Sequence, residues 1–401
     1  MRRETRMLGR ASAANAVICR VVNFLAIVSF ATTQLAYAGP REQAKRIHDR
    51  LAGSPPSAAV LDSMTTKVQS GNALGAAMDA IANPAFYNTT VRELATPWTN
   101  RDRSVYADLN DSTATVIGMV RDDVPFDQIL SGDIVYVGST AATAVAYSQT
   151  NNDHYLALQN NRVDLSNTAN LVRQTQSSLP GEPFTAAETA GIMTTRGFAS
   201  AFLVAGTNRA AVRFASLNLM CMDMEDFRDV SAWPDRIRQD VSRSPGGDSN
   251  LFLNDCLGCH AGLDGLAGAF AFYDYDATAG KLNYTANAVQ PKFLKDASTF
   301  PFGHVTTGDS WINYWRTGPN TFVGWHGPGS GAGAKSLGTE LAQTRQFSEC
   351  QVKNVFKKVC YRAPNGAADL QAVQTIANSF EANNRSLKRA FAETAVYCMG
   401  E

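Results

Sequence analysis

The sequence predicts a mainly α-helical protein with a helical N-terminal domain over 39–230 and a second helical domain over 231–401. In 41–93, apolar residues recur every three or four positions, the spacing that places them on one face of a helix. The same spacing returns near the C-terminus and predicts helices over about 337–360 and 367–397, the latter with a possible break at the two adjacent asparagines.

The middle of the chain contains weaker signals. Short helices are expected around 123–132 and 166–176, and the β-branched run Thr113–Val116 is a candidate strand. The apolar, alanine-rich stretch 185–220 predicts two helices split near Gly206-Thr-Asn208. A polar connection follows, and a glycine-rich loop is expected over 324–333. None of these segments changes the predicted fold class.

The first 38 residues have the pattern of a signal peptide. An arginine-rich start leads into the apolar run Val21–Phe30, and Ala36-Tyr-Ala38 provides small residues at a cleavage site. The run is about half of the roughly 20 residues that a membrane span needs, so cleavage is favoured over an uncleaved anchor. No other run is long enough to span a bilayer, and we expect a periplasmic or secreted protein without a transmembrane segment after cleavage.

The charge balance excludes one class of partner. The predicted signal peptide contains five arginines and one glutamate, so the remaining chain has 31 basic and 35 acidic residues. A mildly acidic chain without a basic cluster does not favour binding to nucleic acid or to an anionic membrane surface.

Six cysteines remain after the predicted cleavage: Cys221, Cys256, Cys259, Cys350, Cys360 and Cys398. In an oxidising compartment, the four outside the closely spaced pair can form two disulfides in three possible arrangements, and buried free thiols are the alternative. If 350–360 is one continuous helix, its two cysteines lie about 15 Å apart and cannot bond to each other.

The segment Asp255-Cys-Leu-Gly-Cys-His260 indicates a haem attachment site. Two thiols separated by two residues can form thioethers to the two vinyl groups of haem c, and the next residue, His260, can bind the iron. We therefore predict Cys256, Cys259 and His260 as the haem-binding residues. The second domain is then a cytochrome c-like haem domain.

Other interpretations of this motif are weaker. From the composition, the pattern would arise by chance about once or twice in a thousand such chains. A zinc site usually needs a second pair of ligands, which the sequence lacks, and a thioredoxin-type dithiol does not require the histidine. A disulfide between Cys256 and Cys259 remains a further alternative.

The ligand on the other side of the iron stays open. His304, His326 and a methionine of the 220–224 cluster, with Met224 as the named candidate, all lie in segments that could reach the haem. An open sixth position is the remaining possibility. A methionine ligand would raise the reduction potential relative to a second histidine.

Three segments carry a family resemblance. Cys256-Leu-Gly-Cys-His260 with its continuation to Asp274, Phe347–Arg362 and Arg46–Gly53 together resemble the large secreted cytochromes often called planctomycete-type. The resemblance implies a mostly helical protein that binds haem and transfers electrons, and it implies no substrate.

We thus expect a c-type cytochrome with one covalent haem that exchanges electrons with a redox partner protein. The alternatives are a haem enzyme of peroxidase or oxygenase type with an open iron position, and a subunit in which 39–230 docks onto a larger redox complex. The unassigned iron ligand decides between carrier and catalyst, and electron transfer is favoured over catalysis.

Overall fold

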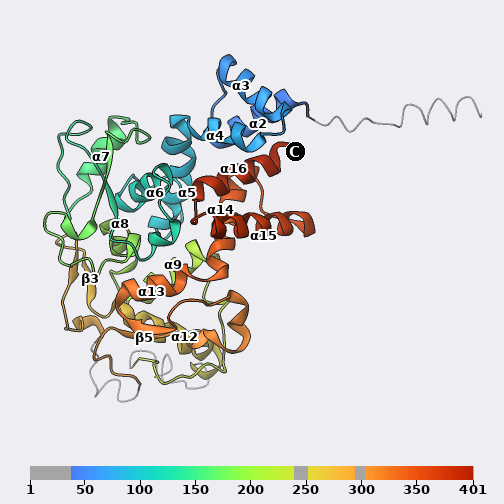
Figure 1. The fold of residues 1–401 in the computed structure, drawn as a ribbon. Coiled ribbons are helices and arrows are strands. Elements are labelled where there is room, and N and C mark those ends of the chain that lie inside the picture. Colours follow the sequence, from blue (N-terminus) through green and yellow to red (C-terminus); the bar gives the residue numbers. More distant parts are fainter. Residues whose placement is uncertain (1–37, 239–251, 294–302, 401) are drawn as a thin grey trace, which may run out of the picture.

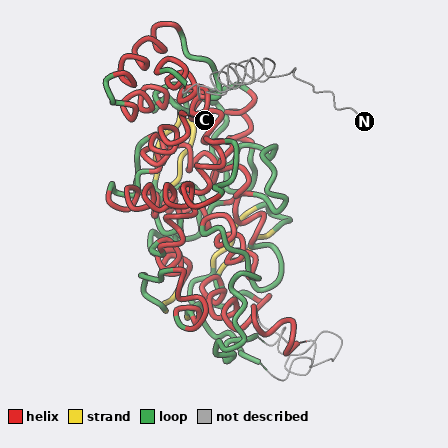
Figure 2. The backbone as a smooth tube through the Cα atoms, turned by 90° about the vertical axis from the view of Figure 1, so that its right-hand side faces the viewer, coloured by secondary structure: helices red, strands yellow, loops and turns green. Residues whose placement is uncertain are grey.

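The computed structural model describes residues 38–238, 252–293 and 303–400, and the predicted mainly α-helical fold class is confirmed. The molecule is elongated, with α2 and α3 at one end and α12 and β5 at the other (Figure 1). Helices fill most of the body, and the described strands form three two-stranded pairs (Figure 2). The predicted signal peptide, except for its last residue, lies outside the described residues.

The N-terminal helices are α2 (Pro40–Ala52), α3 (Ala58–Gln69) and α4 (Ala73–Ile81), which pack against one another. Ser57 begins α3 by accepting a hydrogen bond from the backbone of Val60, which satisfies a free N–H group at the helix start. A π-helical turn and α5 (Arg92–Ala95) continue the chain, and the helical prediction for 41–93 is confirmed outside short breaks.

The middle segment differs from the sequence prediction in three places. Thr113–Val116 lies inside α6 (Asp111–Arg121), whose residues are all buried, so tertiary packing overrides the strand preference of β-branched residues. The expected helix at 166–176 is wrong, because β2 (Leu171–Gln174) pairs antiparallel with β1 (Val135–Gly138). The expected helix near 123–132 is reduced to one 3-10 turn.

The split predicted in 185–220 is confirmed. It separates α8 (Arg196–Phe202) from α9 (Arg209–Leu219), and Asn208 has a φ of 56° in the left-handed region, where the helix direction changes. Helix α7 (Asp153–Asn160) precedes them.

After Cys256 the described chain contains five α-helices, and the first of them includes Cys259 and His260. They are α12 (Leu257–Ala267), α13 (Gly333–Ala342), α14 (Arg345–Cys360) and α15 (Gly366–Ala382), followed by α16 (Leu387–Tyr397) at the end of the chain. The single helix expected over 337–360 is wrong, since α13 ends at Ala342 and Thr344 caps the start of α14. The break expected at Asn383-Asn384 is confirmed between α15 and α16.

Two short antiparallel pairs complete the C-terminal half. Strand β3 (Tyr273–Asp276) pairs with β4 (Lys281–Tyr284), and β5 (Ser310–Ile312) pairs with β6 (Ser330–Ala332). Strand β6 falls inside the segment expected to be a loop.

The first and last described helices of the chain meet in space. Helix α16 packs against α2 and α4, and α14 also contacts α2 (Figure 1). One continuous set of buried apolar side chains extends from Ala44 to Cys398. The domain boundary at 230/231 stays a prediction.

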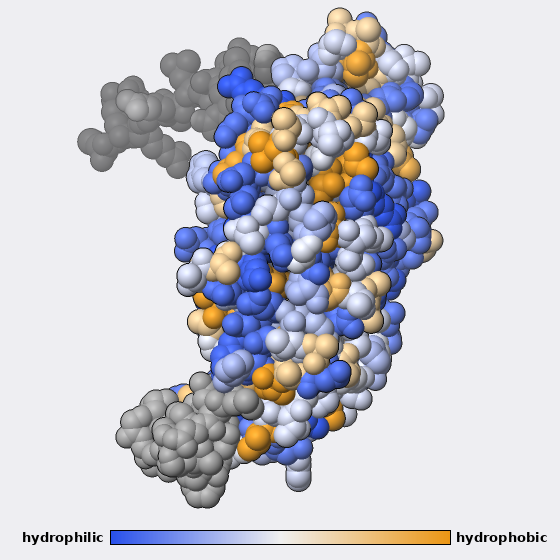
Figure 3. Space-filling view, turned by 90° about the vertical axis from the view of Figure 1, so that its left-hand side faces the viewer, coloured by the Kyte–Doolittle hydropathy of each residue, from blue (hydrophilic) through white to orange (hydrophobic). Residues whose placement is uncertain are grey.

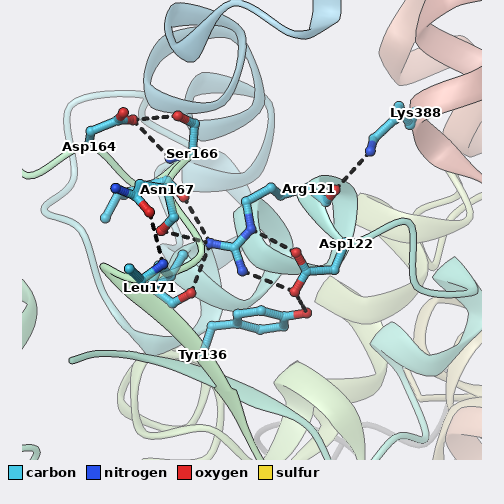
Figure 4. Close-up of polar contacts among 10 residues, drawn as sticks. Arg121, Asp122, Tyr136, Asp164, Ser166, Asn167, Leu171 and Lys388 are labelled. Atoms are coloured by element: carbon cyan, nitrogen blue, oxygen red, sulfur yellow. Dashed lines mark hydrogen bonds and ion pairs between the residues drawn. The ribbon is translucent and has the colours of Figure 1, made fainter.

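A buried arginine holds the middle segment together (Figure 4). The Arg121 guanidinium donates to backbone carbonyls at 165, 167 and 171 over 3.2, 3.3 and 2.8 Å, and it forms a two-point contact with Asp122. Tyr136 donates to the same carboxylate over 2.8 Å. Lys388 of α16 donates to the Arg121 carbonyl, so this network also ties α6 to the C-terminal helices.

Two disulfides are present, Cys221–Cys350 and Cys360–Cys398, with Cα atoms 5.4 and 5.8 Å apart. This arrangement agrees with the prediction that Cys350 and Cys360 cannot pair, since both lie on α14. Among the described residues no helix is long and apolar enough to cross a membrane. On the face shown in Figure 3, hydrophobic side chains are scattered in small patches among hydrophilic ones.

Candidate functional site

The two motif cysteines lie at the start of α12, at the end of the molecule opposite α2 and α3 (Figure 1). Cys256 ends a π-helical turn that begins at Phe252, and Cys259 is in the first turn of α12. Both thiols are unpaired and half-buried. The disulfide between them that the sequence left open is therefore absent, and both sulfurs are available for another bond.

The immediate surroundings of Cys259 are partly apolar. Its sulfur lies 3.5 Å from the backbone carbonyl of Met224, and burial raises the pKa of its thiol. A raised pKa favours the neutral thiol over the reactive thiolate of a dithiol oxidoreductase.

His260 follows on the same turn, and its ring is oriented by a carboxylate. Nδ1 of His260 lies 3.1 Å from Oδ1 of Asp264, four residues later on α12. The hydrogen of the ring therefore belongs on Nδ1, and Nε2 is left as the nitrogen with a lone pair for a metal. About a quarter of the His260 side chain is exposed, at 24%, so a ligand can approach it.

Asp264 is fully buried and receives hydrogen bonds from several directions. The Arg209 guanidinium donates to both carboxylate oxygens over 2.5 and 3.0 Å, and the backbone N–H of Arg238 donates over 3.0 Å. Burial by itself would raise the pKa of Asp264, but the hydrogen bonds from His260 and Arg209 outweigh it and hold the pKa well below its usual range. Asp264 is thus an anion at neutral pH.

Small residues on α12 let the following segment pack directly against the helix. A Cβ atom at Gly262 would lie 2.1 Å from the ring of Trp315, and one at Gly265 would lie 2.7 Å from the carbonyl oxygen of Ile312. Trp315 in turn stacks on Phe227, with ring centroids 4.4 Å apart. The side of α12 that carries these glycines is therefore rigidly supported.

Apolar side chains are unusually exposed around the motif. They belong to segments on either side of α12, and they are Val230 at 64%, Trp233 at 65%, Leu253 at 53% and Val305 at 52% exposure. A cavity of about 410 Å³ opens in the same region, lined mainly by Pro234, Ile237, Leu253, Leu257 and His304. Apolar surface of this kind is typical of a site that a hydrophobic ligand covers.

Of the three candidate ligands for the other side of the iron, His304 shares an apolar cavity with Leu257 of the motif. Its backbone N–H donates to the carbonyl of Ile237 over 2.7 Å, and the backbone N–H of the next residue, Arg238, donates to Asp264. His304 lines the apolar cavity beside Leu257, and burial lowers the pKa of its imidazole.

The other two candidates are placed differently. His326 lines a separate cavity of about 290 Å³ together with Arg345, Glu381 and Arg385. The Met224 side chain is 7% exposed and packs in the main core, while its backbone contacts Cys259. The structure thus groups His304 and the Met224 backbone with the motif, and it does not group His326 with it.

The sequence prediction missed the roles of Asp264, Arg209 and Arg238. A signal existed for Asp264, because a residue four positions after a histidine on a helix faces the same side. No local pattern connects Arg209 or Arg238 to His260. Within the described ranges, no group of three or more His, Cys, Asp or Glu side chains is arranged to hold a metal ion.

Comparison with known proteins adds no assignment. No family model, curated protein or solved structure matched the chain.

Proposed function

We propose that this chain is an exported c-type cytochrome that binds one covalent haem through Cys256 and Cys259, with His260 as an iron ligand, and transfers electrons to or from a redox partner protein. The observation that carries the proposal is the conjunction of two unpaired thiols on one helical turn and a histidine whose Nδ1 is already engaged by a buried carboxylate.

The residues present fit a haem. Each thiol can add across one vinyl group: the sulfur bonds to one carbon, the hydrogen goes to the other, and no oxidant is needed. The exposed apolar side chains and the cavity beside Leu257 offer the contact surface that a porphyrin requires. The cofactor would supply a one-electron iron couple, and the protein would hold it and exclude water from one side.

The sixth ligand is proposed to be His304. It lines the apolar cavity next to the motif, whereas His326 lines a different one and the Met224 side chain is packed in the core. Ligation by two histidines favours a lower potential than ligation by histidine and methionine, and a six-coordinate iron suits a carrier better than a catalyst.

Export supports the proposal independently. The predicted signal peptide would direct the chain to the periplasm or outside the cell, and two disulfides are expected in an oxidising compartment.

The test is expression with a haem-attachment system and detection of haem on a denaturing gel. Wild type should retain haem under denaturing conditions, and Cys256→Ala/Cys259→Ala should lose it. A wild-type chain without covalent haem, or a double variant that keeps it, would overturn the proposal.

Absorption spectra of His304→Ala and the matched control His326→Ala test the sixth ligand. We expect only the first variant to change from low spin to high spin and to bind carbon monoxide. A high-spin wild type that binds carbon monoxide would instead favour the haem enzyme, the second candidate function. If the full chain binds a redox complex equally well with and without haem, the docking subunit is favoured instead.

A further inference from the structure

We propose that Asp264 is a positioning residue that fixes the ring of His260 and lowers the reduction potential of the iron bound there. This inference rests on the proposed function. It goes beyond the motif because Asp264 is not part of the haem attachment sequence and would not touch the haem's reacting atoms.

The first step of the argument is the acceptor on Nδ1. A hydrogen bond from Nδ1 to an acceptor fixes the tautomer and the ring orientation, and it makes Nε2 a stronger donor to a metal. The acceptor here is a carboxylate oxygen at 3.1 Å, which carries more negative charge than a backbone carbonyl or a water molecule. A stronger donor stabilises the oxidised iron over the reduced iron and so lowers the potential.

The second step is how the carboxylate stays charged. Its side chain has no exposed surface, and an unpaired carboxylate in such a place would take up a proton and lose its strength as an acceptor. Arg209 donates to both oxygens, and the Arg238 guanidinium lies 3.8 Å from Oδ1. These two cations keep Asp264 ionised beside His260.

The third step is rigidity. Arg209 is the first residue of α9, and the preceding Asn208 donates from its side chain to the carbonyls of Phe270 and Tyr273 over 2.9 and 2.8 Å. These bonds join the start of α9 to the chain that follows α12. The arginine therefore meets Asp264 in a fixed geometry, and Asp264 transmits that geometry to the His260 ring.

The experiment is spectroelectrochemical titration of haem-loaded full-length protein. In Asp264→Asn the equilibrium constant for reduction should be at least tenfold larger than in wild type, which corresponds to a rise of about 59 mV in the potential of a one-electron couple. Asp264→Glu keeps the charge and should bring the potential most of the way back to the wild-type value. The matched control is Asp369→Asn, which removes another buried carboxylate that is paired with an arginine, on α15 away from α12 (Figure 1), and should leave the potential unchanged.

A second measurement separates the hydrogen bond from a simple charge effect and does not need the variant to fold. In the reduced wild-type protein labelled with ¹⁵N-histidine, the Nδ1 proton of His260 should exchange slowly with solvent. A rapidly exchanging proton, or an Asp264→Asn potential equal to that of wild type, would overturn the inference while leaving haem binding intact. A wild-type chain without covalent haem would overturn the proposed function instead.

Discussion

Removal of the disulfide between Cys221 and Cys350 should lower the free energy of unfolding substantially. The bond closes a loop of 129 residues and joins the end of α9 to α14. Loop closure of this length removes about 17 cal/mol/K of entropy from the unfolded chain, which is about 5 kcal/mol at 25 °C. We therefore expect Cys221→Ala/Cys350→Ala to lose up to about 5 kcal/mol.

The assay is urea unfolding without reductant, followed by circular dichroism. The matched control is Cys360→Ala/Cys398→Ala, which opens a loop of 38 residues and should cost up to about 4 kcal/mol, about 1 kcal/mol less than the longer loop. Reductant should lower the stability of the wild type by more than either variant does, because it opens both bonds. An unchanged midpoint for the first variant, or a greater loss for the shorter loop, would refute the reasoning.

Three further predictions concern other parts of the fold. Burial raises the pKa of Glu182 to about 7 from its ordinary 4.5, so the folded state holds the proton more tightly than the unfolded chain. As the pH rises from 4.5 to about 7, the wild type should lose about 3 kcal/mol of stability relative to Glu182→Gln. Urea unfolding at about pH 5 and pH 8 checks this, and an equal change with pH in both proteins would contradict it. Gly262→Ala would place a Cβ atom 2.1 Å from Trp315 and should cost about 1–3 kcal/mol, seen as a lower Tm; an unchanged Tm would mean that the ring can move away. Arg121→Ala should cost about 3 kcal/mol in chemical unfolding because it removes the ion pair with Asp122 and the arginine's hydrogen bonds to three carbonyls. The exposed Arg173→Ala should change stability by less than about 0.5 kcal/mol, and equal effects would refute the role of the buried network.

Local spacing was enough for several features. The helical face in 41–93 and the break at Asn383-Asn384 follow from patterns within a few turns of chain, and both are confirmed. The exclusion of a Cys350–Cys360 bond needed only the rise of a helix. The haem motif was found in the same way, since its three functional residues lie within five positions, although the bound haem stays a prediction.

Other features depend on contacts between distant residues, which no local pattern encodes. Thr113–Val116 is helical because α6 is buried on every side, and burial outweighs the strand preference of its side chains. The pairing of Cys221 with Cys350 required α9 and α14 to meet. No pattern in the sequence separates His304 from His326, since only the tertiary structure puts them in different cavities.

The candidate site likewise combines features that local sequence determines with features that depend on distant contacts. The sequence by itself determined that two thiols and a histidine share one helical turn, because that arrangement needs only the 3.6-residue period. Only the tertiary structure decided that the carboxylate beside the histidine is buried and stays ionised, because a buried anion needs cations to balance it. Those cations, Arg209 and Arg238, come from segments 55 and 26 residues away from Asp264.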